Sequence, residues 1–141
     1  MPTRERLAAR QHRVVDDLLH GRVPDGFDAL RARHTARILA MKRVDAIERA
    51  CEEVTWLPGW RDLAVRFCFE QPTRGCAHTD RDEFIAWLRR NDLARNWIRL
   101  ADVYAGRRRS TVYDGDLVVS WRSEVVHLRL TPSRGNSWHS D

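Results

Sequence analysis

The chain has 141 residues, a length typical of one domain that can bury a single core without disulfide or metal support. Hydrophobic residues make up 43% of it and charged residues 32%, with six tryptophans, which excludes a disordered chain. No run of about 18 apolar residues occurs, and residues 1–6 lack the apolar stretch of a signal peptide, so we expect a cytoplasmic protein.

The positive charge is almost entirely arginine. The net charge is +5, Lys42 is the single lysine, and the other cations are arginines. Guanidinium groups pair with carboxylates and phosphates through two parallel hydrogen bonds, so an acidic partner is expected.

Two helices are predicted in the first third of the chain. Apolar residues at helical spacing indicate a helix over residues 3–20, and the breakers of residues 21–26 indicate a turn. A second helix, capped by Asp28, is expected to run to Val54. Its predicted apolar face comprises Leu30, Ile38, Met41, Val44, Ile47, Cys51 and Val54.

Three shorter helices are predicted next. Pro58 suits the first turn of a third helix, which stops before Pro72. Asp80 and Glu83 have the spacing of a capping box and predict the start of a fourth helix. A fifth helix is expected to open at residues 91–92 and to end at Gly106.

After Gly106 the apolar period changes from helical to alternating. Three strands are expected: one through residues 111–113, one over 116–121 and one over 124–131. The Asp114-Gly115 pair favours a tight hairpin turn. The sequence therefore predicts an α+β fold, with a helical domain of about five helices over residues 1–106 and a three-stranded antiparallel β-meander with a tail over 107–141, packed as one unit.

Residues with catalytic or metal-binding chemistry do not gather in the sequence. Cysteine occurs at three positions, an odd count, and the six histidines are scattered singly. Cys76 and His78 resemble half of a metal site, but no second pair stands at ligand spacing. No nucleophile elbow, phosphate-binding loop or HExxH motif is present, so we expect no catalytic residues, no metal site and no cofactor in this chain.

The predicted meander carries the functional hypothesis. Three strands leave two edges with unpaired backbone groups unless something covers them, and an extended peptide can add a strand there. Packing of the helices and tail over these edges is the alternative. The residues expected to bind a peptide are Arg107, Arg108, Arg109, Val118, Val119, Ser120, Trp121, Arg122, Val126, His127 and Leu128. Backbone pairing is expected either along residues 118–121 or along the opposite edge at residues 126–130, and the arginines are expected to hold acidic residues of the peptide.

Four segments together resemble a known protein family. They are H-T-A-R-I-L-A-M-K-R-V-D-A-I-E-R-A (34–50), W-L-P-G-W (56–60), F-C-F-E-Q-P (67–72) and D-E-F-I-A-W-L (82–88). They are similar to the helical domain of the partner proteins that accompany multinuclear non-heme iron-dependent oxidative enzymes, including the methanobactin-type partner.

This resemblance implies a non-catalytic accessory subunit in peptide natural-product (RiPP) biosynthesis. Such a subunit binds the leader of a ribosomally made precursor peptide and forms a heterodimer with an enzyme that holds the iron. The alternative is a basic nucleic-acid-binding regulatory domain, suggested by the pI near 9.8. Because no helix-turn-helix pattern with a recognition helix is evident, nucleic acid is the less favoured partner, and no membrane partner is expected.

Overall fold

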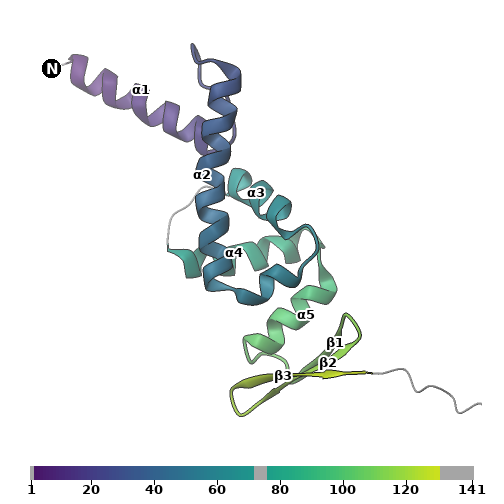
Figure 1. The fold of residues 1–141 in the computed structure, drawn as a ribbon. Helices are drawn as coiled ribbons and strands as arrows, with labels where there is room; N and C mark the ends of the chain where they lie inside the picture. Colours follow the sequence, from purple (N-terminus) through teal and green to yellow (C-terminus); the bar gives the residue numbers. More distant parts are fainter. Residues whose placement is uncertain (1, 72–75, 131–141) are drawn as a thin grey trace, which may run out of the picture. The chain divides into compact units, whose positions relative to one another are not determined.

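The computed structural model describes residues 2–71 and 76–130 of the chain. It has an α+β fold in which five α-helices precede a three-stranded antiparallel sheet (Figure 1). The elements are α1 (Pro2–Leu19), α2 (Ala29–Ala50), the 3₁₀ helix η1 (Glu52–Trp56), α3 (Trp60–Glu70), α4 (Ala77–Arg90), α5 (Arg95–Tyr104), β1 (Ser110–Tyr113), β2 (Asp116–Trp121) and β3 (Glu124–Arg129).

Contacts divide the chain into two compact units, Met1–Leu93 and Ala94–Asp141. The predicted domain boundary at residue 106 therefore lies inside the second unit, and α5 belongs with the strands rather than with the preceding helices. That the two parts pack as one unit stays a prediction.

In the first unit, α1, α3 and α4 all pack against α2 (Figure 1). The predicted cap of α2 is confirmed, because the Asp28 carboxylate accepts a hydrogen bond from the Arg31 amide at 2.8 Å. The helix is shorter than expected. It ends at Ala50, and η1 carries the chain past the predicted end at Val54.

The predicted apolar face of α2 is only half right. Val44, Ile47, Cys51 and Val54 are buried, but Leu30 is 78% and Ile38 is 45% exposed. The buried stripe continues instead through Ala32, Ala36 and Ala40, which lie on the opposite side of the helix from Leu30 and Ile38. Neighbouring segments pack against small alanines there, and the larger apolar side chains face outward.

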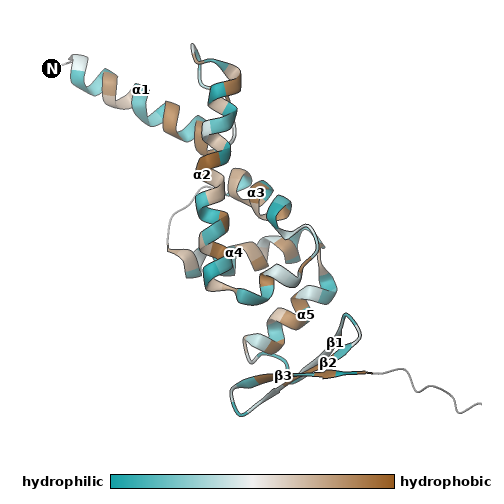
Figure 2. Ribbon diagram, viewed as in Figure 1, coloured by the Kyte–Doolittle hydropathy of each residue, from teal (hydrophilic) through white to brown (hydrophobic). Residues whose placement is uncertain are grey.

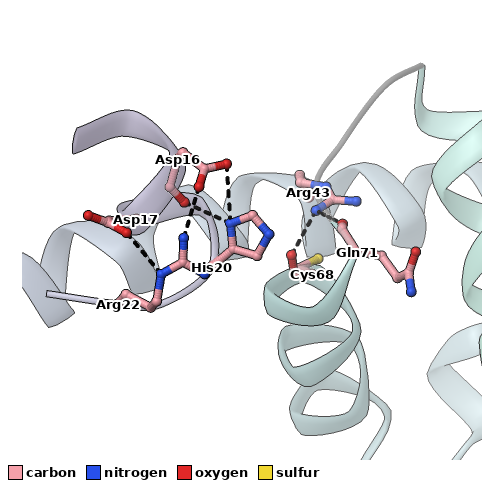
Figure 3. Close-up of polar contacts among 7 residues, drawn as sticks. All are labelled: Asp16, Asp17, His20, Arg22, Arg43, Cys68 and Gln71. Atoms are coloured by element: carbon pink, nitrogen blue, oxygen red, sulfur yellow. Dashed lines mark hydrogen bonds and ion pairs between the residues drawn. The ribbon is translucent and has the colours of Figure 1, made fainter. Parts of the chain in front are cut away.

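The capping box predicted for α4 is wrong. The helix begins at Ala77, which places Asp80 inside it, where it is 4% exposed. The Asp80 carboxylate accepts two hydrogen bonds from Arg43 of α2, at 2.8 and 3.1 Å. Arg43 also donates to the carbonyls of Cys68 and Gln71 at the end of α3 (Figure 3). One guanidinium therefore joins α2, α3 and α4.

Aromatic rings fill the space between α3 and α4. The ring centroids of Phe67 and Phe84 lie 5.5 Å apart, and the ring of Trp87 stacks on Phe84 at 6.2 Å. The indole N–H of Trp87 donates to the Glu70 carboxylate at 2.7 Å, so this buried ring keeps a polar partner. α3 starts at Trp60, two residues after Pro58, because Gly59 is left-handed (φ +69°).

In the second unit, α5 packs against β1 and β2. The helix begins at Arg95 rather than at residues 91–92, because Asp92 and Ala94 have left-handed backbones (φ 56° and 54°) that interrupt the helix. Its buried residues are Trp97, Ile98, Leu100, Ala101 and Val103.

Two tight turns join the strands. Asp114 and Gly115 both have positive φ, which confirms the predicted β1–β2 hairpin. Arg122 and Ser123 also both have positive φ, at 47° and 68°, and join β2 to β3. The strand order is β1-β2-β3, so β2 is central and β1 and β3 are the edges.

Candidate functional site

The sheet has one buried and one exposed face. Thr111, Val118 and His127 are register partners across the three strands, and Thr111 and Val118 are buried on the side that packs on α5. Side chains alternate along a strand, so their neighbours point to the other side. That side is apolar, and Figure 2 shows hydrophobic colour in this region of the sheet. Its members are Val112, Leu117, Val119, Trp121, Val126, Leu128 and Leu130, which we call the apolar sheet face.

This face is open to solvent. Val112, Trp121, Val126, Leu128 and Leu130 are between 42% and 66% exposed. Contiguous apolar patches are uncommon on monomeric proteins and mark sites of interaction. A hydrophobic contact is therefore the main chemistry that this side of the sheet offers.

The hydrogen-bond ladder identifies the outer rim of β3. The Leu130 amide donates to the Gly115 carbonyl at 3.1 Å, and Trp121 and Glu124 flank a two-residue turn. Residues with even numbers on β3 therefore bond to β2, and the alternation of an antiparallel ladder turns the peptide groups of Val125, His127 and Arg129 away from it. Among the described residues, no strand lies on that outer side of β3.

A polar cluster holds this rim against α5 and β2. The Tyr104 hydroxyl lies 3.0 Å from His127 Nε2, and the other ring nitrogen of His127 lies 3.9 Å from Asp116. Arg129 Nε is 2.9 Å from Asp116 Oδ1, a charge contact without the alignment of a hydrogen bond. These contacts hold the His127 ring, at the middle of β3, against α5 and β2.

Arginines gather at one end of the sheet. Arg109 lies beside the end of β2, because its carbonyl accepts a hydrogen bond from the Ser120 amide at 2.8 Å. Arg122 occupies the β2–β3 turn at the same end, with its guanidinium 5.9 Å from the centre of the Trp121 ring. Arg107 and Arg108 directly precede Arg109 and are exposed. We call these four residues the arginine end.

Most of this positive charge lacks a nearby carboxylate. Arg107 lies 4.0 Å from Asp102, a weak contact at the limit of an ion pair. Arg108 donates to the Ser110 carbonyl at 2.8 Å. Within residues 2–71 and 76–130, neither Arg109 nor Arg122 forms an ion pair. An acidic ligand would supply the missing partner.

The predicted site residues separate into three groups. Arg107, Arg108, Arg109 and Arg122 come together at the arginine end. Val119, Trp121, Val126 and Leu128 share the apolar sheet face. Val118, Ser120 and His127 lie on the opposite side of the sheet, where Val118 is fully buried against α5.

One part of the edge hypothesis is wrong. Residues 118–121 lie on β2, whose backbone pairs with β1 and β3, so they cannot accept a further strand. Val125 on the rim and Val112 and Leu117 on the apolar sheet face were missed, whereas Arg129 and Leu130 lie within the alternative edge predicted at residues 126–130. The alternation of the predicted third strand, combined with its position at the end of the meander, was the signal that could have found them.

Other reactive groups do not form a site in the described part of the chain. Burial raises the pKa of Cys51 to about 12 and that of Cys68 to about 11. Cys76 is exposed, and hydrogen bonds from the Thr79 amide and hydroxyl lower the pKa of its thiol. In these ranges no three His, Cys, Asp or Glu side chains cluster as metal ligands, Cys76 and His78 included. Nor does any helix there combine the length and apolar character that a bilayer crossing requires.

Comparison with known proteins identifies the family to which the first unit is similar. Neither the curated proteins nor the solved structures contain a match to the chain. A family model described as SCO6045-like, C-terminal domain, matches residues 8–90, which extend from α1 to the end of α4. The chain therefore belongs to the SCO6045-like C-terminal domain family.

Proposed function

We propose that the chain is a non-catalytic accessory subunit that binds a precursor peptide by adding it as a strand to β3. The peptide is the leader of a ribosomally made precursor, and the chain presents it to an iron-dependent oxidative enzyme on which it docks. A sequence resemblance supports the proposed iron enzyme partner and the proposed role in peptide biosynthesis. It is the similarity to the partner proteins of such enzymes that is found in residues 34–50, 56–60, 67–72 and 82–88.

The observation that carries the peptide-binding step is the outer rim of β3. An added strand gains affinity from backbone hydrogen bonds, which every peptide can form. Val125 and Arg129 place outward peptide groups roughly 13 Å apart, at about 3.4 Å per residue, which gives a rim long enough for a guest of about five residues.

Selectivity would come from the side chains on each side of the rim. Val126, Leu128 and Leu130 are exposed beside it, so alternate residues of the guest would rest on the apolar sheet face. Acidic residues of the guest would pair with the arginine end, where two-pronged guanidinium contacts are available. The expected ligand is therefore an extended peptide with alternating apolar residues and a flanking acidic segment.

The first experiment measures binding of a synthetic extended peptide with alternating apolar residues and a flanking acidic segment. Val125→Pro removes the outward amide donor without removing a bond to β2, and proline is tolerated at such edge positions. We expect at least tenfold weaker binding by fluorescence anisotropy. Val125→Ala is the matched control, because it shortens the same side chain but keeps the amide, and should bind within about twofold of the unaltered chain.

A folded Val125→Pro variant with unaltered affinity would refute strand addition at β3. A gel-shift titration with duplex DNA distinguishes the nucleic-acid alternative, since phosphate binding weakens steeply as salt rises. For the enzyme step, the iron enzyme and the precursor are incubated with and without this chain. Equal modification in both reactions would refute the accessory role.

A further inference from the structure

A second apolar surface lies on α2, in the first unit. Leu30, His34, Ile38 and Met41 follow one another at intervals of four, four and three residues, so they form one stripe along the helix. Its side is distinct from that of the buried alanines of α2, and both Leu30 and Ile38 are largely exposed. We call these four residues the outer stripe.

The outer stripe borders two shallow, wide-open hollows rather than closed cavities. One hollow of about 570 Å³ is lined by Leu30, Arg31, His34 and Thr35. A second, of about 360 Å³, is lined by residues 34–45 of the same helix, including Ile38, Met41 and Lys42. His34 borders both, so the two hollows follow each other along the helix over roughly 20 Å, at about 1.5 Å per residue.

The charges around these hollows are mostly positive and uncompensated. Arg31, Arg37 and Lys42 border them, and no carboxylate of the described residues forms an ion pair with any of the three. The one acid at the border, Asp45, already lies 3.2 Å from Arg61. An apolar row flanked by free cations is complementary to an apolar row flanked by acids.

We propose that the outer stripe docks an amphipathic, acidic helix of a partner protein. The apolar side chains of that helix would enter the two hollows, and its flanking Asp and Glu residues would pair with Arg31, Arg37 and Lys42. A helix fits best because its ridges have the same three- and four-residue spacing as the grooves of α2. The observations behind this proposal come from the first unit alone, whereas those for the proposed peptide site come from the second unit.

The probe is a synthetic 21-residue helical peptide, at about 30 Å long enough to cover the stripe, with leucine on one face and glutamate on the others. We expect it to bind the full chain. Two control peptides should each bind at least tenfold more weakly: one has lysine in place of glutamate, and the other has serine in place of leucine. These controls separate the charge and apolar contributions.

Substitutions in the chain locate the binding surface. Ile38→Glu and Arg37→Glu should each weaken binding of the glutamate peptide at least tenfold, while circular dichroism stays unaltered because both positions are exposed. Arg90→Glu is the matched control: it makes the same charge change at an exposed position of α4, which lines neither hollow. It should weaken binding less than threefold.

Several results would overturn the proposal. Equal affinity for the glutamate and lysine peptides would remove the charge argument, and full binding by Ile38→Glu would remove the apolar one. Phosphatidylglycerol vesicles or duplex DNA that compete with the peptide at these residues would assign the stripe to a phosphate-bearing surface instead. A dimer in sedimentation that Ile38→Glu abolishes would assign it to a second copy of the chain.

Discussion

Arg43 Nη2 lies 2.8 Å from Asp80 Oδ1, and the two side chains are only 11% and 5% exposed. The same guanidinium lies 5.5 Å from the centre of the Phe67 ring and bonds two carbonyls at the end of α3. A buried ion pair with all these partners contributes specificity, because only one arrangement of α2, α3 and α4 satisfies both charges.

Breaking this pair should destabilise the first unit strongly. Asp80→Asn leaves a buried guanidinium without its counter-charge, and removal of one partner from such a pair costs about 3 kcal/mol or more. We expect a loss of this size in the free energy of unfolding measured in urea. Arg61→Ala is the matched control, since Arg61 pairs with Asp45 and Glu48 at the surface and its loss should cost under about 1 kcal/mol. Equal effects would contradict the burial of the Arg43–Asp80 pair.

The three cysteines should react at different rates. Iodoacetamide attacks thiolates, and Cys51 and Cys68 are buried with pKa values raised to about 12 and about 11. Cys76 is exposed, with a pKa lowered from the usual 9.0. Intact-mass measurement should therefore show one label on the native chain at pH 8 and three in denaturant. A native chain without label, or a Cys76→Ser variant with one, would contradict this order.

The same buried thiols predict loss of stability at high pH. Below the ordinary pKa of 9.0, the thiols are protonated in both folded and unfolded chains. Above it, the unfolded thiols ionise first, because those of the folded chain stay protonated to about pH 11, so unfolding becomes more favourable as pH rises. In urea titrations between pH 9 and 10.5, Cys51→Ala should reduce this slope. An unaltered slope would contradict the raised pKa.

The Glu70 carboxylate should become protonated at a lower pH than an ordinary glutamate. The hydrogen bond from the Trp87 indole, with that from Arg66, lowers the pKa of Glu70 below 4.5. Its contribution to stability is present above the ordinary pKa and is lost as pH falls through the lowered value. The Trp87 indole resonance in ¹⁵N spectra should therefore titrate with a midpoint below 4.5. In Glu70→Gln this step should disappear, and a midpoint at or above 4.5 would contradict the bond.

A substitution in the β2–β3 turn should increase the stability of the second unit. Ser123 has φ +68°, a conformation that costs a residue with a Cβ about 1 kcal/mol and costs glycine nothing. Ser123→Gly should raise the free energy of unfolding of the second unit by up to about 1 kcal/mol. Gly115→Ala, at φ +79° in the other turn, should lower it by a similar amount. Effects of the same sign would contradict the left-handed turns.

The types and order of the elements could be predicted because their signals are local. Helical spacing and the Asp114-Gly115 pair depend only on neighbouring residues, and the structure has five helices and then three strands. The function of Asp80 could not be predicted, since a carboxylate three residues after the true helix start resembles a cap until its partner, 37 positions away, is known. The burial of Ala36 beside the exposed Ile38 likewise depends on which neighbours pack on α2.

The candidate site was predicted in composition but not in placement. The sequence identified the strands, their meander order and the arginines, and a meander already places its second strand in the centre. Which peptide groups of the edge strand turn outward depends in addition on the pairing register of β2 and β3, which is a tertiary property. With β2 in the centre, residues 118–121 are not on the rim, and the outward peptide groups are those of Val125, His127 and Arg129.

The open rim of β3 beside the exposed apolar sheet face also affects how the protein behaves when no ligand is bound. The β3 strands of two copies of the chain can pair through the same backbone groups that would bind a peptide. The exposed side chains of Val126 and Leu128 favour such self-association. Excess chain without ligand would then be the species that aggregates. Cells would keep the protein in solution best by making it together with whatever occupies that rim.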